Sequence, residues 1–171
     1  MKVSLLEFPD DKAWLAVKER ALVTVGKHAI TPPDHDWKQR ILEARHSPIR
    51  YLRFSFFLED IPYWVSVHLC RHIHAQPYVR TQRNDRQNNY ERNAARQDAP
   101  VSMLWDMNAE ELMVICEKRL CLSSSEETRN VVKEMSKLVI DACPEFKDLL
   151  KPKCEWTGGK CYEFYSCKNK V

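Results

Sequence analysis

The stretch RYLRFSFFL, residues 50–58, has the most regular alternation of apolar and polar side chains in the chain. Leu52, Phe54 and Phe56 fall on one side of an extended backbone, and the residues between them fall on the other. Because successive side chains of a strand point to opposite faces, this period of two predicts a half-buried β-strand. MKVSLLEF at residues 1–8 predicts a second, short strand, and PYVRTQR at residues 77–83 has extended character.

Helices are predicted between and after these strands. Residues 11–25 and 37–44 have helical patterns, separated by the loop ITPPDHD. Asp60 is a candidate N-cap with Pro62 in the first turn, and this helix should run to about His72. Within it, His68, Arg71 and His72 are spaced three and four residues apart and share one face.

Two further helices are predicted in the second half of the chain. Asn108 and Glu111 form an N-cap pair for a helix that should end near Leu120. Ser124 and Glu127 form a candidate capping box for the next helix, whose apolar stripe over residues 131–142 has helical spacing. The stretch from residue 84 to residue 100 is polar and lacks helical periodicity, so we expect a functional loop there.

Together these elements predict an α+β fold with a mixed or antiparallel sheet packed with helices. A length of 171 residues fits one domain spanning residues 1–171, of which residues 151–171 form an irregular, cysteine-bearing tail. No apolar run approaches the roughly 18 residues of a membrane span. The first residues lack a signal-peptide core, and an odd total of seven cysteines favours reduced thiols, so we expect a cytoplasmic protein.

The chain has only three glycines, at positions 26, 158 and 159. A Walker loop and a dinucleotide-binding GxGxxG turn both need glycines at fixed spacing, because the backbone there approaches phosphate closely. Both motifs are therefore excluded. A phosphorylated ligand would have to be bound by side chains, and arginine suits bidentate phosphate binding best.

Cations concentrate in residues 70–86, CRHIHAQPYVRTQRNDR, which hold four arginines and two histidines. Arg71 and His72 could simply complement the negative end of a helix, and the later arginines could lie in a solvated loop. An alternative is a phosphate site. On an extended segment Thr81 and Arg83 point to the same side, and a hydroxyl with a guanidinium suits phosphate.

Metal sites are two further alternatives. His68 and His72 have the i, i+4 spacing of helical zinc ligands, with His74 following, but no acidic residue stands near them in sequence. The second candidate is a structural zinc site in and before the tail, although its spacings differ from the usual C-x2–4-C. Its predicted ligands are Cys143, Cys154, Cys161 and Cys167. The alternative for these four residues is a set of reduced, partly buried thiols.

The order of several segments resembles the flavin-dependent thymidylate synthases. The family signature R-H-R-x-x-S-x-N-E-x-S-x-R-Y, laid on RHIHAQPYVRTQRN, matches Arg71, His72 and Arg83, with Thr81 in place of the second serine. HSPIRYLRFSF, ARQDAP and NAEELMVICEKRL resemble three further family segments in the right order. The resemblance covers roughly residues 49–150, and the chain looks like a divergent, phage-type branch.

This resemblance implies methylation of dUMP at C5, with FAD, methylenetetrahydrofolate and NADPH, in a homotetramer whose active sites lie between subunits. Arg71, His72 and Asn108 would contact the flavin. Ser47 and His46 would complete the cofactor contacts, with His46 near the folate entrance.

For the nucleotide, the resemblance implies that Thr81, Arg83 and Arg96 hold the phosphate and sugar of dUMP. Arg119 would contact the pyrimidine. A guanidinium at a pyrimidine oxygen stabilises the enolate charge that develops when C5 acts as a nucleophile. Arg119 and Arg83 are thus the predicted catalytic residues.

Within the signature, Ile73, Gln76, Tyr78 and Asn84 replace arginine, serine, asparagine and tyrosine. Five further departures put the flavin groups in doubt more than the nucleotide arginines. Arg50 replaces a glutamate, Glu110 an arginine, Val114 an asparagine, Ser123 a histidine and Val79 the signature glutamate. The sequence therefore leaves alternatives open. The chain could act on a related pyrimidine deoxynucleotide, bind a nucleotide without turnover, or bind nucleic acid through residues 71–96. A net charge of only +3 does not favour the last of these.

Overall fold

A computed structural model of the chain describes residues 1–86 and 91–167. Four strands form one antiparallel sheet in the order β1-β2-β4-β3. Their bounds are Lys2–Glu7 for β1, Arg53–Pro62 for β2, Gln76–Val79 for β3 and Pro100–Asn108 for β4. The two long strands, β2 and β4, form the centre of the sheet, and Phe56 pairs with Trp105 near the middle of their register.

Helices surround the sheet on one face and at one end. In chain order they are α1 (Asp11–Val23), α2 (His35–Glu43), α3 (Tyr63–Leu69), α4 (Ala109–Arg119), α5 (Glu126–Ala142) and the short α6 (Lys153–Trp156). Three 3-10 turns, η1 (Ser47–Tyr51), η2 (Arg92–Ala94) and η3 (Pro144–Phe146), lie between them. No helix in the described part of the chain is long and apolar enough to cross a membrane.

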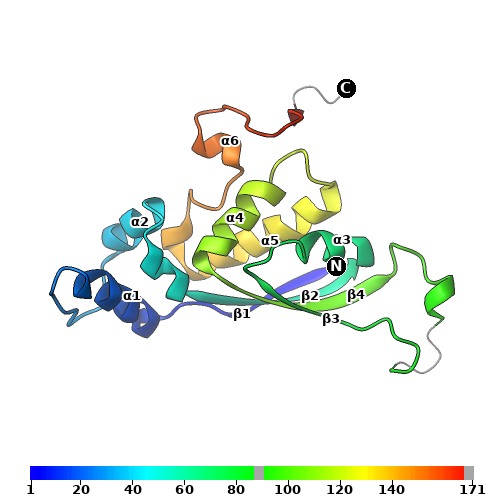
Figure 1. The fold of residues 1–171 in the computed structure, drawn as a ribbon, viewed down its shortest axis with the longest axis horizontal. Helices are drawn as coiled ribbons and strands as arrows, with labels where there is room; N and C mark the ends of the chain where they lie inside the picture. Colours follow the sequence, from blue (N-terminus) through cyan, green and yellow to red (C-terminus); the bar gives the residue numbers. More distant parts are fainter. Residues whose placement is uncertain (87–90, 168–171) are drawn as a thin grey trace.

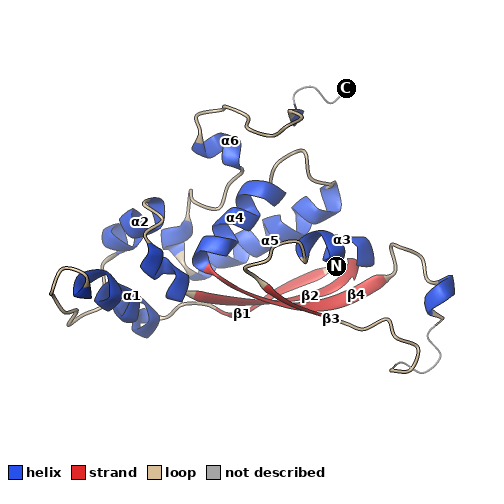
Figure 2. Ribbon diagram, in the orientation of Figure 1, coloured by secondary structure: helices blue, strands red, loops and turns tan. Residues whose placement is uncertain are grey.

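The helices are arranged unevenly about the sheet. Figure 1 shows α3, α4 and α5 packed on one face of the sheet, while α1 and α2 lie at one end. The tail with α6 lies on the outer side of α4, away from the sheet, and the strands and helices form two clear layers (Figure 2). Residues 80–86 and 91–99, between β3 and β4, extend from the end of the sheet opposite α1 and α2 (Figure 1).

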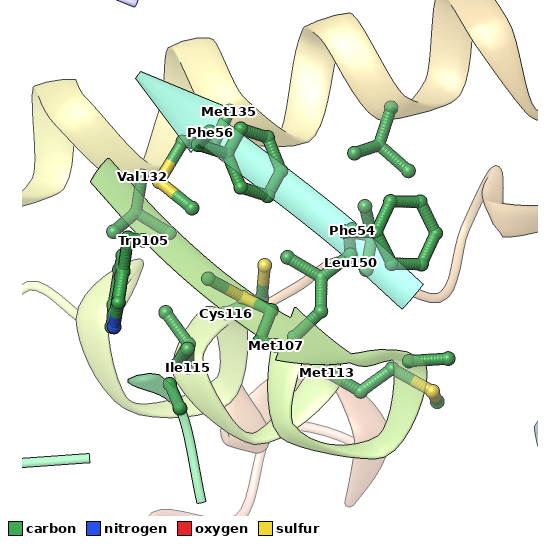
Figure 3. Packing of buried hydrophobic residues seen from close by; sticks show 14 of the residues in the cluster. Phe54, Phe56, Trp105, Met107, Met113, Ile115, Cys116, Val132, Met135 and Leu150 are labelled. Carbon is green, nitrogen blue, oxygen red and sulfur yellow. The ribbon is translucent and has the colours of Figure 1, made fainter. Parts of the chain in front are cut away.

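The hydrophobic core lies between the sheet and α4 and α5 (Figure 3). Phe54 and Phe56 of β2 and Trp105 of β4 are at most 1% exposed. Phe54 packs edge-on against Phe146 of η3 with ring centroids 5.3 Å apart. Burying each such aromatic side chain contributes about 1.5–3 kcal/mol, so this core fixes where the ends of α3 and α4 lie.

The predicted α+β fold is confirmed, with an antiparallel rather than a mixed sheet. The strand predicted at residues 50–58 is β2, which begins at Arg53 and runs on to Pro62. The predicted cap at Asp60 is wrong: Asp60 has a φ of 53° inside a strand irregularity, and α3 begins at Tyr63. That helix also ends at Leu69 rather than at His72.

The predicted helices of the second half are present, with one shifted start. The Asn108 side chain accepts a hydrogen bond from the backbone N–H of Glu111 at 2.9 Å, as predicted for an N-cap. The capping box predicted at Ser124 and Glu127 is wrong by one residue, because Ser125 caps α5 by accepting from the N–H of Thr128. The Ser124 hydroxyl instead donates to the carbonyl of Lys118 and so ties the α4–α5 turn.

Candidate functional site

Three polar side chains meet in the core between the end of α3 and the inner side of α4. His72 lies just after α3 and is 8% exposed, and Glu111 in the first turn of α4 is 5% exposed. Arg119 ends α4 two turns further on and is half-buried. Buried polar groups are costly unless they are hydrogen-bonded, so their contacts decide what this cluster can do.

The three side chains form a continuous hydrogen-bonded network. Arg119 donates from Nε to Nε2 of His72 at 2.9 Å, and from Nη2 to the backbone carbonyl of His68 at 2.9 Å. Because the guanidinium is always a donor, Nε2 of His72 must accept, and the imidazole proton resides on Nδ1. From there it is donated to the Glu111 carboxylate, 3.2 Å away.

This network fixes the orientation of the Arg119 guanidinium. Two of its donors are used internally, and Nη1 stays available for a ligand. The imidazole of His72 is held in turn by Glu111 and by edge-on packing against Trp105, with centroids 6.1 Å apart. The sequence predicted Arg119 and His72 as site residues, and the structure brings them into direct contact.

Glu111 is a member of the network that the sequence did not mark as a site residue. The sequence predicted Glu111 only as the partner of Asn108 in an N-cap, and its backbone N–H does donate to the Asn108 side chain. Its side chain bonds instead to a histidine 39 positions away. The signal in the sequence was a carboxylate next to the apolar residues Leu112 and Met113, which indicates a charged side chain close to the core. Both neighbours are indeed buried in the structure.

A cationic pocket of about 270 Å³ opens beside Arg119. We use this name for the hollow whose basic lining residues are His68, Arg71, Lys118 and Arg119, with the α4–α5 turn as the opposite wall. Burial lowers the pKa of the Arg119 guanidinium, and the nearby charge of Arg71 lowers it further. In residues 1–86 and 91–167 neither Arg71 nor Arg119 forms an ion pair with a carboxylate.

A second pocket, of about 400 Å³, lies beside the first turns of α4, whereas the cationic pocket lies beside its last turn. It is lined by Arg50 of η1, by His74, and by Asn108, Glu110, Glu111 and Val114. The Arg50 guanidinium donates from Nε to the Glu110 carboxylate. This bond with Arg50 lowers the pKa of Glu110, against an opposing effect of burial.

The Arg50–Glu110 ion pair changes the interpretation of two departures from the family pattern. Where the family pattern has a glutamate before β2 and an arginine in α4, this chain has Arg50 and Glu110 in direct contact. Two separate losses would leave two unpaired charges, whereas these two residues compensate each other. Relative to the family pattern the signs of the two charges are exchanged, and Asn108 lines the same pocket. The same two departures had suggested a weakened flavin site.

The other predicted cofactor residues lie close by on η1. His46 is its N-terminal flanking residue and Ser47 is its first residue, and both side chains are exposed. His46 lies four residues before Arg50, and Ser47 lies three residues before it. His46 and Ser47 therefore lie at the start of η1, the element that contributes Arg50 to the second pocket, but they do not line that pocket.

The extended segment predicted at residues 77–83 forms a strand only in its first part, and its arginines are not half-buried on that strand as a phosphate site there would require. Strand β3 ends at Val79, one residue before Arg80, and the arginines beyond it are exposed. Arg83 makes a two-pronged contact with Asp85 at 2.9 and 2.6 Å, and its side chain is 62% exposed. Arg96 contacts Asp98 in the same way, at 2.8 and 3.0 Å.

The loop arginines do share one predicted feature. The Thr81 hydroxyl accepts a hydrogen bond from the backbone N–H of Arg83 at 3.2 Å, so the two residues do lie together. The guanidiniums of Arg83 and Arg96 point to their own aspartates, however, and their pKa values are raised by these contacts. Neither arginine lines the cationic pocket with Arg119. Residues 87–90 of the functional loop predicted between residues 84 and 100 lie outside the described residues.

The predicted four-cysteine zinc site is not assembled. Cys143 is 2% exposed at the end of α5, where burial raises the pKa of its thiol to about 12. Cys154, Cys161 and Cys167 instead line a different pocket together with Cys121. In the described ranges no three His, Cys, Asp or Glu side chains lie close enough to hold a metal ion.

The histidine metal site is not assembled either. His68 stacks edge-on against Trp64 at 5.4 Å, while His72 uses Nε2 to accept from Arg119. His74 faces the second pocket beside Glu110. The three side chains thus point into different surroundings.

Comparison with known proteins gives one sequence match and a set of structural matches. The family model described as "Thy1: Thymidylate synthase complementing protein" matches residues 92–145, which include β4, α4 and α5. No curated protein matches the chain.

Two solved structures have similar folds at low identity. A UMP/dUMP methylase PolB from Streptomyces cacaoi, bound with 5-Br dUMP, has a TM-score of 0.66 and 14% identity over 84% of this chain and 92% of its own. Thymidylate Synthase X (ThyX) from Helicobacter pylori, with FAD and dUMP, has a TM-score of 0.69 and 15% identity over 88% of this chain and 100% of its own.

The sequence match lies over β4 and α4, which carry Asn108, Glu111 and Arg119, and the structural matches extend over most of the chain. The predicted resemblance to the flavin-dependent thymidylate synthase family is thereby confirmed.

Proposed function

We propose that the chain is a flavin-dependent methyltransferase that converts dUMP, or a closely related pyrimidine deoxynucleotide, to its C5-methylated product. The observation that carries the proposal is the Glu111–His72–Arg119 network, which holds a half-buried guanidinium at the wall of a cationic pocket. The two similar structures are of proteins whose names and ligands concern dUMP and its methylation, which supports this choice of substrate.

The residues of the second pocket fit a flavin. Asn108, His74 and the Arg50–Glu110 pair supply donors and acceptors around about 400 Å³. FAD held by these residues would supply the two electrons that reduce the transferred carbon, and NADPH would restore them. Of the other predicted flavin residues, Arg71 lines the cationic pocket, and both ring nitrogens of His72 are used in the network with Arg119 and Glu111. His46 and Ser47, on the exposed end of η1, would contact methylenetetrahydrofolate as it enters.

Arg119 would act on the pyrimidine. C5 of uracil is a weak nucleophile, and it attacks the folate methylene more readily when the ring carries enolate charge on one of its oxygens. A guanidinium fixed by two internal hydrogen bonds can donate its remaining N–H groups to that oxygen without reorganising. The C5 proton then leaves, and the methylene is reduced to a methyl group.

Thr81, Arg83 and Arg96 would bind the nucleotide phosphate in this proposal. Both arginines are paired with aspartates in the single chain, so phosphate must replace a carboxylate in each contact. Such exposed ion pairs are weak, so the exchange costs little. The exposed position of the loop suits a site completed by a second subunit, which is why we propose a homotetramer.

The experiment is conversion of dUMP by the purified full-length chain. The protein is incubated with FAD, NADPH, methylenetetrahydrofolate and dUMP, and the nucleotide is analysed by mass spectrometry. We expect a product about 14 mass units heavier, from the added CH₂, and omission of FAD should abolish it. A protein that binds dUMP but forms no product with fresh cofactors would be a nucleotide-binding relative, the second candidate, for which Val114 and Ser123 are the supporting departures.

A further inference from the structure

The cationic pocket contains more positive charge than the proposed contact of Arg119 with the pyrimidine requires. Arg71, Lys118 and Arg119 all line it, and they come from the end of α3 and the last turn of α4. Its volume of about 270 Å³ lies below the range of sites for drug-sized ligands, so it suits a small charged group.

Two of these cations are not neutralised by carboxylates in the described ranges. Arg119 bonds to an imidazole nitrogen and to a backbone carbonyl, which are both uncharged acceptors. Burial first, and then the charge of Arg71, lower the pKa of Arg119. Like charges held together at a half-buried position are stabilised by an anion between them.

Among the described residues that line this pocket, the carboxylate is that of Glu163 in the tail. Glu163 lines the pocket and accepts from Nζ of Lys118 at 3.0 Å. Its side chain is 33% exposed, and that of Lys118 is 49% exposed. Residue 163 lies 44 positions beyond Arg119, in the segment drawn orange to red above α4 in Figure 1. The tail therefore contributes an anion to a site built by α3 and α4.

We propose that the cationic pocket binds a phosphoryl group and that Glu163 of the tail occupies part of this site in the free protein. Oxygen atoms of phosphate accept from guanidinium and ammonium groups in the same way as a carboxylate, but with more charge. Binding of the phosphoryl group displaces Glu163 from Lys118 and releases the tail from this contact. The inference rests on the proposed function only for the identity of the ligand that carries the phosphoryl group. Binding of a phosphoryl group does not itself require that the protein methylates a nucleotide.

The competing explanation is that the Lys118–Glu163 pair only fastens the tail to α4. The tail has another contact with the rest of the protein, because the Arg45 guanidinium lies over the Trp156 ring of α6. The two explanations predict opposite effects of removing the charge of Glu163. Loss of a competitor tightens anion binding, whereas loss of a fastener leaves anion affinity unchanged or weakens it.

The test is calorimetric titration of inorganic pyrophosphate into the full-length chain at fixed ionic strength. We expect Glu163→Gln to tighten pyrophosphate binding by roughly threefold, the size of a surface ion pair. Lys118→Ala should weaken binding by about tenfold, since it removes a charged hydrogen-bond donor. Glu155→Gln is the matched control: Glu155 lies in α6, in the same tail, but does not line the cationic pocket, so it should bind as the parent does.

The result for Glu163→Gln decides between the explanations. Unchanged or weaker pyrophosphate binding, or binding in no variant at all, overturns the proposal. Competition titrations then identify the source of the phosphoryl group. Prior saturation with FAD blocks pyrophosphate if the site takes a cofactor diphosphate. Prior saturation with dUMP blocks it if the site takes the nucleotide phosphate, which would also contradict the proposed contact of that phosphate with Arg83 and Arg96. A chain that binds pyrophosphate as expected but forms no methylated product would contradict the proposed function and leave this inference standing.

Discussion

Two groups of arginines in this protein look alike in the sequence and differ completely in the structure. Arg119 is half-buried and oriented by the neutral acceptors His72 and the carbonyl of His68. Arg83 and Arg96 are exposed, and each is held by an aspartate two residues further along the chain. The first arginine has its charge available, and the other two have theirs already paired.

This difference suits the two groups of arginines to different roles, one in the chemical step and the other in binding the nucleotide. A guanidinium oriented in a half-buried site can stabilise charge that develops in a transition state, because it need not move when that charge appears. An exposed arginine paired with its own aspartate can exchange that carboxylate for a phosphate, which favours binding rather than chemistry. We therefore expect the chemical step to depend on Arg119 and nucleotide affinity to depend on the loop.

The largest effect is expected for Arg119→Ala. Turnover of dUMP at saturating substrate should fall by about 10²–10³-fold, the usual effect of removing one preorganised donor to a developing oxyanion. The variant should remain folded by circular dichroism, because Arg119 lies at the end of α4 and is only half-buried. Turnover within about threefold of the parent would show that the pyrimidine lies elsewhere.

Arg83→Ala should act on affinity instead. We expect dUMP binding to weaken by roughly 30-fold, while deoxyuridine, which lacks the phosphate, binds as before. Calorimetric titration of both ligands measures this difference. Arg86→Ala, in the same exposed loop, is the control and should change dUMP binding far less. Equal binding of dUMP by Arg83→Ala and the parent would remove the phosphate from this segment.

Glu111→Ala should destabilise the fold by about 1–3 kcal/mol, because it leaves the buried Nδ1–H of His72 without its acceptor. Glu111→Gln keeps an acceptor oxygen and should recover most of that loss in urea unfolding. Nitrogen NMR of the imidazole should show the proton on Nδ1 in the parent and in Glu111→Gln. An imidazole carrying its proton on Nε2 would contradict the network.

Removing the Arg50–Glu110 pair should have a smaller effect, on the free energy of unfolding, and the direction of its pH dependence can be stated. Arg50 lowers the pKa of Glu110 from its ordinary value of 4.5. A carboxylate with a lowered folded-state pKa stabilises the fold above the unfolded value, and this stability is lost as pH falls through the folded value. Urea unfolding at about pH 6 and about pH 3 should therefore show a smaller loss on acidification for Arg50→Gln than for the parent.

The same pair tests the reversed polarity. Arg50→Glu and Glu110→Arg should each weaken FAD binding, and the double variant, which restores the family arrangement, should recover it within a few-fold. Additive losses in the double variant would mean that the two departures do not compensate each other.

Asp85→Asn should give the smallest change and the opposite sign. Removing the carboxylate that pairs with Arg83 frees the guanidinium, so dUMP should bind a few-fold more tightly. The titration is the one used for Arg83→Ala. Weaker binding would mean that Asp85 positions Arg83 for phosphate instead of competing with it.

The sequence predicted those parts of the molecule that depend on local pattern. The alternation at residues 50–58 predicted β2, and the spacing of Asn108 and Glu111 predicted the start of α4. The resemblance implied that Arg71 and His72 contact the flavin and that Arg119 contacts the pyrimidine, and in the structure Arg119 contacts His72 and lies beside Arg71.

Contacts between distant residues could not be predicted in this way. Glu111 lies 39 positions from His72, and Arg50 lies 60 positions from Glu110, so no local spacing reveals either pair. The exposure of Arg83 had a different cause. Strand β3 ends at Val79 where its pairing with β4 ends at Met103, and an extended composition alone does not show where a neighbouring strand stops.

The central claim is tested most directly by release of tritium from dUMP labelled at C5, measured for the parent and for Arg119→Lys at saturating nucleotide. The label is lost as a proton only when C5 forms a new bond, so the measurement reports the step assigned to the Arg119 guanidinium. We predict release by the parent that requires FAD, NADPH and methylenetetrahydrofolate. Lysine keeps the charge but lacks the planar group that bonds both His72 and a ligand, so Arg119→Lys should release tritium roughly tenfold more slowly or worse. Equal rates for the two proteins, or no release by the parent with all three present, would contradict the account.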